Sequence, residues 1–378
     1  MKDVLMQINE IRLHRLRMHL KQPFLTSFGT ISEKEFFIIE VIDDHGTIGY
    51  GESVAFTTPW YTEETVKTVE HIMEQFLIPL VFQQSFHHPM EVAKRFHTVK
   101  GNPMAKAALE TALWDLYAKR TKKPLWEMIG GIRSEVEVGV SIGIQPSIKT
   151  LLDKIDAYLQ EGYRRVKLKV KPGHDIDVLK HVRQAFPTVP LMVDANSAYT
   201  LNDLHHLKKF DEFQLLMIEQ PFGEREFLEH AELQTVLDTP ICLDESIRCL
   251  DDVKLATKLG SGKIFNVKIG RIGGLTEAIH IHQFSKENNI PLWCGGMFES
   301  GIGRALNISL ASLEQFLLPG DISASNRYWD ADIIKPEITH KKGKIAVSER
   351  PGIGFHISYR EMERHLVERK TFKNKNIS

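Results

Sequence analysis

The sequence of 378 residues predicts an α/β protein with a modified TIM barrel of the (β/α)7β type and a second, α+β domain. Two observations support this fold class. After Gly130-Gly131, short apolar stretches alternate with amphipathic helical stretches, which is the pattern of repeated βα units. The residues before these glycines lack that alternation. We therefore expect an α+β domain at 1–130, a barrel at 131–330 and a C-terminal segment at 331–378 that returns to the first domain.

The first domain is expected to begin with strands of antiparallel character. Residues 8–17 predict one strand, and residues 36–52 predict two strands joined by a turn. The turn falls at Asp44-His45-Gly46, because a glycine can adopt the positive φ of a tight hairpin.

Two helices are predicted after these strands, at 62–80 and 102–119. The second has Asn102 at its N-cap and Pro103 at its first helical position, where both residue types are preferred. Its apolar residues recur at helical spacing and form one stripe: Ala105, Ala108, Leu109, Ala112, Leu113 and Leu116.

Eight strands separated by seven helical stretches are predicted in the barrel region. The strands lie near residues 136–144, 165–171, 190–196, 215–221, 240–246, 264–270, 291–297 and 317–323. Beyond residue 330 the pattern changes to a hairpin-like stretch, ITHKKGKIAV, and a polar helix near 360–368.

Composition limits the classes of function. A hydrophobic content of 42% and a charged content of 26% are ordinary for a globular chain, and a net charge of -1 supplies no field that attracts polyanions. No stretch reaches roughly 18 consecutive apolar residues, and the start MKDVLMQINEIRLHR is too polar for a secretory signal. We expect a cytoplasmic protein that binds neither nucleic acid nor a membrane.

Cysteine and histidine patterns exclude two kinds of site. Cys242, Cys249 and Cys294 are odd in number and have no CxxC spacing, so we expect reduced thiols and neither a disulfide framework nor a thiolate zinc site. None of the 17 histidines lies in an HExxH pattern.

Five charged residues follow the barrel repeat. Lys169, Asp194, Glu219, Asp244 and Lys268 lie near the C-terminal ends of successive strands, at steps of 25, 25, 25 and 24 residues. A strand that is buried on both faces should not carry a charge without a reason. Because the C-terminal ends of barrel strands meet at one rim, where active sites of this fold are built, we expect these five side chains to lie together.

The three carboxylates predict a metal site. Asp194, Glu219 and Asp244 would repel one another at the rim unless a cation lay between them. Ligands that are all oxygen atoms favour a hard divalent ion, first Mg²⁺ and next Mn²⁺.

The lysines predict proton transfer. In the strand VKLKV, Lys167 and Lys169 share one face, which is also typical of an exposed antiparallel strand with one wet face. In a barrel, however, they approach the metal centre from one side and Lys268 approaches it from the other. This arrangement suits removal of a proton next to a substrate carboxylate, because a divalent ion can stabilise the enediolate. A lysine base near neutral pH needs a pKa lowered by about three units, or roughly 4 kcal/mol.

Short motifs carry a family resemblance over nearly the whole chain. "KLK" at 167–169, "DAN" at 194–196, "EQP" at 219–221, "DES" at 244–246 and "NVKIGRIGG" at 266–274 resemble the enolase superfamily in its muconate-lactonizing subgroup. Within that subgroup, three further stretches resemble the o-succinylbenzoate synthases, in the branch that also contains N-acylamino acid racemases: "TTPWYTEET" at 57–65, "CGGMFESGIGRALN" at 294–307 and "PGDIS" at 319–323.

The resemblance implies a reaction. It is the dehydration of 2-succinyl-6-hydroxy-2,4-cyclohexadiene-1-carboxylate to o-succinylbenzoate in menaquinone synthesis, with Asp194, Glu219 and Asp244 holding Mg²⁺. Lys169 would take the α-proton and then protonate the departing hydroxyl, while Lys268 steadies the enediolate. In the alternative, racemisation of an N-acylamino acid, the two lysines would serve as base and acid on opposite faces.

The resemblance also implies substrate contacts. Ser141, Lys167, Asn196 and the backbone at Gly296 and Met297 match positions that touch the substrate or support the site. A simple hydrogen-bonding role at a strand end remains an alternative for Ser141 and Asn196. The resemblance implies that the substrate is a small carboxylate. It leaves the oligomeric state open, and a homo-oligomer is one of the states that it allows.

Three further expectations concern the surroundings of the site. Gly295 and Gly296 would let backbone N–H groups approach an anion. Arg271 resembles an arginine associated with racemase competence, unless it is a surface residue. The first domain would cap the barrel, with loops at Pro23–Ile31 and Thr57–Thr62 whose aromatic residues serve the substrate pocket or the core: Phe24, Phe28 and Trp60.

Other functions remain as alternatives. Dipeptide epimerases typically carry Asp-x-Asp at the eighth strand, whereas this chain has Asp321-Ile322-Ser323. A muconate cycloisomerase fits the catalytic residues, although the seventh-strand segment fits it less well. A non-catalytic barrel that binds a carboxylated metabolite is the alternative from another class, which the presence of all five charged residues disfavours.

Overall fold

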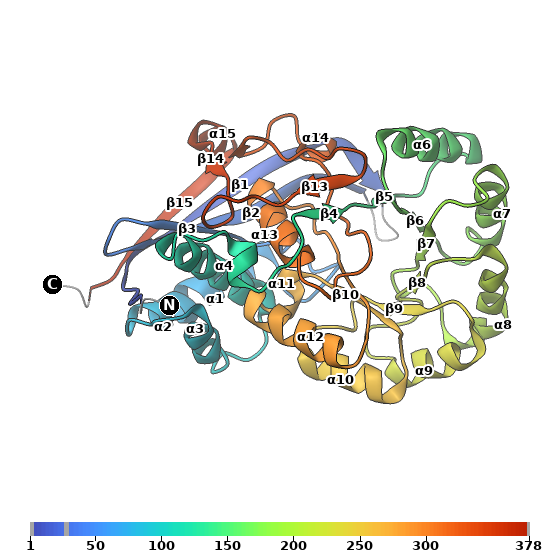
Figure 1. The fold of residues 1–378 in the computed structure, drawn as a ribbon, viewed down its shortest axis with the longest axis horizontal. Coiled ribbons are helices and arrows are strands. Elements are labelled where there is room, and N and C mark those ends of the chain that lie inside the picture. The colour runs from blue at the N-terminus through green and yellow to red at the C-terminus, as the bar shows by residue number, and fades with distance from the viewer. Residues whose placement is uncertain (1–3, 26–29, 376–378) are drawn as a thin grey trace.

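A computed structural model describes residues 4–25 and 30–375 and has two parts (Figure 1). An antiparallel sheet lies beside helices α1 to α4, and a curled parallel sheet lies inside an arc of helices that includes α6 to α10. The predicted α/β class, with a barrel-like sheet and an α+β capping domain, is confirmed. The predicted domain boundaries at residues 130 and 330 stay a prediction.

The capping domain contains a four-stranded antiparallel sheet of order β15-β1-β2-β3. Its strands are β1 (Ile8–Leu25), β2 (Thr30–Asp43), β3 (Ile48–Glu52) and β15 (Leu366–Lys373). The predicted turn is present, with Gly46 at a φ of 73°. The predicted helix at 360–368 ends early, because α15 (Tyr359–His365) gives way to β15, which pairs with β1. Side chains along β15 alternate between partly buried and exposed, which is the period of a strand with one covered face. This period of two favours a strand here over the predicted helix.

The helices of the capping domain follow the predicted order. They are α1 (Val66–Ile72), a π-helical turn η1 (Met73–Leu77), α2 (Ile78–Phe82), α3 (Pro89–Phe96) and α4 (Pro103–Arg120). The prediction did not include α3.

Asn102 and Pro103 occupy the predicted N-cap and first helical positions of α4, but the side chain of Asn102 does not cap the helix. Asn102 has a left-handed backbone and makes no capping bond to α4. The carboxylate of Glu64 accepts hydrogen bonds from the backbone nitrogens of Met104, at 2.8 Å, and Ala105, at 3.0 Å. A side chain from another element therefore satisfies the helix terminus, which local sequence patterns do not reveal.

Two glycines of β3 allow this strand to lie directly on α4. A Cβ atom on Gly49 would lie 2.1 Å from the carbonyl oxygen of Ala112, and one on Gly51 would lie 2.1 Å from that of Ala108. Only glycine permits such a close approach of strand and helix backbones.

The barrel-like domain contains a parallel sheet of order β11-β10-β9-β8-β7-β6-β5. Its strands are β5 (Val140–Ile142), β6 (Val166–Lys169), β7 (Leu191–Asp194), β8 (Ile218–Glu219), β9 (Ile241–Leu243), β10 (Ile264–Val267) and β11 (Leu292–Cys294). The main helices between and after them are α6 (Ile148–Glu161), α7 (Ile176–Ala185), α8 (Leu204–Leu207), α9 (Phe227–Val236), α10 (Leu250–Leu259), α12 (Leu275–Glu287) and α13 (Gly301–Ala311).

The predicted eighth strand is not formed as a continuous strand. Residues 317–323 instead hydrogen-bond to both edges of the sheet: the Asp321 nitrogen donates to the Cys294 carbonyl at 2.9 Å, and the Gly139 nitrogen donates to the Gly320 carbonyl at 2.8 Å. Pro319, which has no N–H group, interrupts the ladder. The segment still occupies the position of the eighth strand.

Two further strand predictions need correction. The predicted first strand divides into β5 and a separate β4 (Glu135–Glu137). In the hairpin-like stretch, a tight turn joins Lys341 to Lys344, and β13 (Lys344–Ala346) then pairs with β4 and not with its own hairpin arm. The remaining short elements are α5 (Leu125–Met128), η2 (Leu201–Asp203), η3 (Lys208–Phe213), α11 (Ile269–Ile272), α14 (Ser325–Tyr328), β12 (Ile334–Lys335) and β14 (His356–Ile357).

A buried carboxylate of α4 connects the two parts. Glu110 accepts hydrogen bonds of 2.8 Å from the backbone nitrogens of Leu275 and Thr276, which begin α12. A carboxylate at a helix N-terminus satisfies free N–H groups and complements the helix dipole. The capping domain is thereby fixed against the barrel-like sheet.

The structure bears on the predictions about disulfide bonds and about membrane-spanning helices. Cys242, Cys249 and Cys294 are unpaired. Among the helices of residues 4–25 and 30–375, none is both long and apolar enough to cross a membrane.

Candidate active site

The strand register brings the predicted charged residues together. Lys169 pairs with Asp194 across β6 and β7, and Asp194 pairs with Glu219 across β7 and β8. Asp244 follows β9, and Lys268 follows β10. The five side chains therefore meet at the C-terminal rim of the parallel sheet.

Lys169 is held from two sides. Its Nζ donates hydrogen bonds of 2.6 Å to Oδ2 of Asp194 and of 2.6 Å to Oδ1 of Asn196. Asn196 has a φ of 43°, a left-handed backbone that asparagine tolerates better than most residues. Its own amide donates to Glu245 at 3.0 Å, so the oxygen of the amide stays turned toward Lys169.

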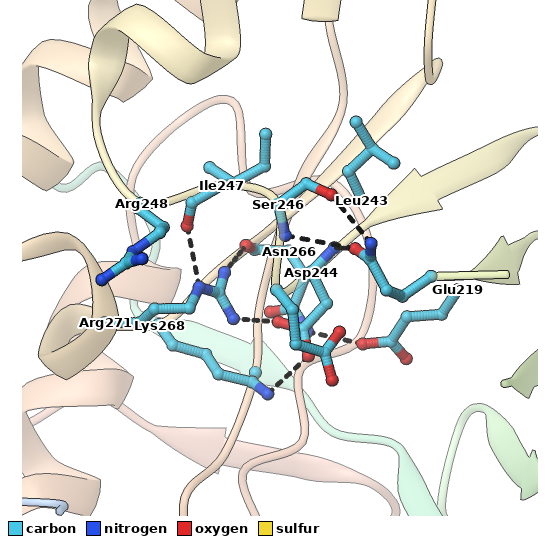
Figure 2. A network of polar contacts seen from close by, with 12 residues as sticks. Glu219, Leu243, Asp244, Ser246, Ile247, Arg248, Asn266, Lys268 and Arg271 are labelled. Carbon is cyan, nitrogen blue, oxygen red and sulfur yellow. Dashed lines mark hydrogen bonds and ion pairs between the residues drawn. The ribbon is translucent and has the colours of Figure 1, made fainter. Parts of the chain in front are cut away.

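Lys268 lies on the opposite side of the rim. Its Nζ donates to Oδ2 of Asp244 at 2.7 Å and to the hydroxyl of Tyr61 at 2.9 Å (Figure 2 shows the Asp244 contact). Burial opposes the charge of this lysine, but the carboxylate of Asp244 outweighs burial and holds the pKa of Lys268 above its ordinary value. Lys268 is therefore a cation.

Arg271 is part of this centre and is not a surface residue. It is 1% exposed, and its guanidinium donates to Oδ1 of Asp244 and to the carbonyl of Ile247 at 2.8 Å (Figure 2). It also donates to the hydroxyl of Tyr61 at 2.9 Å. Burial opposes the charge of Asp244, but Arg271 and Lys268 together hold its pKa below the usual range. Asp244 is therefore a carboxylate.

Lys167 is a buried cation beneath the site. Its Nζ donates to Asp321 at 2.6 Å and to Glu219 at 3.0 Å, and it lies 4.8 Å from the centre of the Trp293 ring. Burial lowers the pKa of Lys167, but the carboxylates of Asp321, Glu219 and Asp194 raise it well above the ordinary value. This lysine therefore compensates negative charge below the rim.

The carboxylates form an acidic centre of oxygen atoms only. Glu219 is fully buried and accepts from the amide of Asn266 at 2.7 Å; burial, followed by the charge of Asp194, raises its pKa to about 8. Across the described part of the chain, no three Asp, Glu, His or Cys side chains already lie in ligand geometry. Asp194, Glu219 and Asp244 each accept from at least one lysine instead. Buried acids that require positive charge are a suitable donor set for a hard divalent cation.

A partly enclosed cavity opens above these groups. Its wall contains every predicted substrate-contact residue together with both candidate catalytic lysines: Ser141, Lys167, Lys169, Asn196, Lys268, Gly296 and Met297. Aromatic residues cover the other side: Phe56, Trp60, Tyr61, Phe298 and Tyr328. Trp60 thus lies at the cavity, whereas Phe28 and the side chain of Phe24 lie outside the described residues.

The two glycines of the seventh-strand segment leave room for neighbours. A Cβ on Gly295 would lie 2.5 Å from Cε of Lys268 and 2.3 Å from Oδ1 of Asn266. A Cβ on Gly296 would lie 2.6 Å from the carbonyl oxygen of Asp321. Close packing explains both glycines, whereas their predicted role in approaching an anion stays a prediction.

Sequence reasoning missed three residues of the site. Asn266 stands two residues before Lys268 and so faces the same side of its strand, which strand periodicity could have revealed. Asp321 is predicted from the sequence only as the first acid of an incomplete Asp-x-Asp motif, whereas in the structure it pairs with Lys167 at 2.6 Å. Tyr61 lies on the capping domain, 207 residues before Lys268, and no local pattern connects the two.

Two family descriptions match the chain. "Mandelate racemase / muconate lactonizing enzyme, N-terminal domain" matches residues 8–130, and "Enolase C-terminal domain-like" matches residues 150–362. Together they account for most of the sequence.

Full-length relatives agree with these matches. The chain is 54% identical over 365 residues to an o-succinylbenzoate synthase from Geobacillus kaustophilus, with 97% of each chain covered. It is 45% identical over 359 residues to an N-succinylamino acid racemase from Thermus thermophilus, covering 95% of this chain and 97% of that one. A crystal structure of an enolase superfamily member from Listeria innocua, 43% identical, matches with a TM-score of 0.95 and covers 98% of this chain and 100% of that one.

Proposed function

The chain belongs to the mandelate racemase/muconate lactonizing enzyme family of the enolase superfamily, and from this premise we propose that it catalyses the o-succinylbenzoate synthase reaction. The substrate is 2-succinyl-6-hydroxy-2,4-cyclohexadiene-1-carboxylate, and the products are o-succinylbenzoate and water. One observation carries the proposal: Lys169 and Lys268 lie on opposite sides of a rim of three buried carboxylates.

Lys169 is the base in this proposal. Its nitrogen is fixed at the cavity wall by Asp194 and Asn196, which orients it toward a bound carboxylate. It removes the proton from the carbon that carries the ring carboxylate. The same ammonium then gives that proton to the hydroxyl on the neighbouring carbon, which leaves as water.

Lys268 stabilises the negative charge that develops on the substrate carboxylate. Because Asp244 keeps this lysine protonated, it supplies a fixed positive charge in a buried site, where such a charge is most effective. The aromatic residues above the cavity exclude water from the enediolate.

Asp194, Glu219 and Asp244 would hold the divalent cation, Mg²⁺ in first place and Mn²⁺ in second. Bound there, such a cation lowers the energy of an enediolate as a Lewis acid. We place the reaction in menaquinone synthesis and in the cytoplasm, where unpaired cysteines stay reduced.

Turnover of the cyclohexadiene substrate, followed by its ultraviolet absorbance, tests the proposal. We expect rapid loss of substrate with Mg²⁺ and none after treatment with excess EDTA. Absence of turnover with Mg²⁺ and with Mn²⁺ contradicts the proposed reaction.

Racemisation of N-succinylamino acids is the second candidate function. Arg271 favours it, because this buried arginine contacts Asp244 and Tyr61, the same two groups that hold Lys268. One relative also bears the name of that activity. Optical rotation of N-succinylphenylalanine incubated with the enzyme and Mg²⁺ tests it, and an unchanged rotation excludes it for that substrate.

A further inference from the structure

A second cavity adjoins the active site. The two cavities share Ser141 and Tyr328 as wall residues. Ser141 pairs with Lys167 across β5 and β6, so the second cavity lies on the Lys169 side of the rim. Arg327 and Lys154 line it, and its described wall contains no aspartate or glutamate.

Arg327 is held in place but is only partly satisfied. Its Nη2 donates to the carbonyl of Ser141 at 2.6 Å, and its guanidinium carbon lies 4.7 Å from the centre of the Tyr158 ring and 5.4 Å from that of Tyr328. Its Nε and Nη1 are buried and have no hydrogen-bond partner among the described residues. Buried donors without partners are costly and call for an explanation.

Three fully buried arginines of this domain, in contrast, have acidic partners. Arg165 pairs with Asp321, Arg271 with Asp244 and Arg304 with Asp332. Arg327 forms no ion pair with any residue in the described ranges. Arg327 lines the second cavity as a fixed guanidinium whose charge no carboxylate of the described residues balances, so it is suited to bind a carboxylate that enters this cavity.

We propose that Arg327, assisted by Lys154, binds the second carboxylate of the substrate, at the end of its succinyl chain. This inference rests on the proposed function, because the substrate of that reaction carries two carboxylates. The ring carboxylate must lie between Lys169 and Lys268, where the proton is removed. The succinyl chain then extends past Ser141 and Tyr328, and its terminal carboxylate reaches the adjoining cavity.

Two ligands that differ only at the chain end test the proposal. They are o-succinylbenzoate and 2-butanoylbenzoate, in which a methyl group replaces the terminal carboxylate. Calorimetry with Mg²⁺ measures Kd of both for the wild type and for Arg327→Met, Arg327→Lys and Lys154→Met, with Arg350→Met as an exposed control.

We expect Arg327→Met to weaken o-succinylbenzoate binding by about 10- to 100-fold, as for hydrogen bonds to a charged group, and to change 2-butanoylbenzoate binding less than about threefold. Arg327→Lys should restore part of the difference, Lys154→Met should lose less, and Arg350→Met should lose nothing. In turnover, Arg327→Met should raise KM much more than it lowers kcat.

The inference is overturned if Arg327→Met weakens both ligands equally, which indicates a purely structural role, or if it weakens neither. It is also overturned if the wild type has no preference for the dicarboxylate. The proposed function is tested separately by turnover of the wild type. A wild type that prefers the dicarboxylate through Arg327 but does not dehydrate the substrate refutes the reaction and keeps the binding site.

Discussion

The carboxylate of Glu52, at the end of β3, accepts a hydrogen bond of 2.9 Å from the backbone nitrogen of Ser300, at the N-cap of α13. It also accepts from the hydroxyl of Ser300 at 2.5 Å and from the nitrogen of Gly303 at 2.8 Å. Nearby, the buried ammonium of Lys34 donates to the carbonyl of Met297, in the cavity wall. The capping domain therefore holds the segment that closes one side of the active site.

Glu52→Gln should loosen this attachment. An amide cannot accept all three hydrogen bonds, so a buried donor loses its partner and we expect the free energy of unfolding to fall by about 1–3 kcal/mol. Catalytic efficiency should fall as well, because Met297 and its neighbours are less well placed. Urea unfolding and kcat/KM measure the two effects, and the exposed Glu349→Gln is the control. Unchanged stability contradicts a holding role for Glu52.

Lys169→Met and Lys268→Met separate the two candidate reactions. For dehydration, removal of the base in Lys169→Met should lower kcat by about 10²- to 10⁴-fold or more. For racemisation, each variant should still exchange the α-proton of one N-succinylamino acid enantiomer with deuterated water, because the remaining lysine faces one side only. Proton NMR of the two enantiomers measures the exchange. Equal loss for both enantiomers in both variants contradicts the two-sided arrangement.

Much of the fold and the acidic rim could be predicted from the sequence. The charges at Lys169, Asp194 and Glu219 interrupt apolar runs once per βα unit, and parallel strands bring such positions to one edge. The register of β6, β7 and β8 then follows from the repeat itself. Such periodic patterns predict structure where each βα unit repeats the geometry of the unit before it.

The remaining features depend on contacts between distant elements. Glu64 caps α4 in place of Asn102, and Tyr61 reaches Lys268 from another domain. The eighth strand is not continuous, because Pro319 interrupts backbone pairing, although its apolar pattern resembles that of a strand. Tertiary packing decides such positions, and a single sequence does not record it.

His230 should make the fold sensitive to acid. This histidine is fully buried: its Nδ1 bonds to the carbonyl of Glu226 at 2.6 Å, and its Nε2 accepts from the backbone nitrogen of Phe222 at 3.2 Å. Burial lowers its pKa to about 4, since a charged imidazolium is disfavoured away from water. Protonation of Nε2 would also remove the acceptor for the nitrogen of Phe222. The unfolded chain binds a proton at about pH 6.5, so stability is complete above that pH and falls toward pH 4 by about 3 kcal/mol at most.

Urea unfolding between pH 4 and pH 7 measures this dependence. His230→Gln should flatten the slope, because glutamine carries no titratable group, whereas the exposed His71→Gln should leave it unchanged. A wild-type slope that persists in His230→Gln assigns the acid sensitivity to other groups.

Gly295→Ala should damage the active site more than the fold. The added Cβ would lie 2.5 Å from Cε of Lys268 and 2.3 Å from Oδ1 of Asn266, so both side chains must move away from Asp244 and Glu219. We expect kcat to fall about 10²-fold, because small misplacements of a catalytic group are expensive. Gly223→Ala is the matched control, since its Cβ would meet only the flexible carboxylate of Glu226, at 3.2 Å. Steady-state kinetics and thermal unfolding compare the variants. Normal kcat in Gly295→Ala would show that Lys268 tolerates displacement and would contradict its role as a fixed cation beside the substrate.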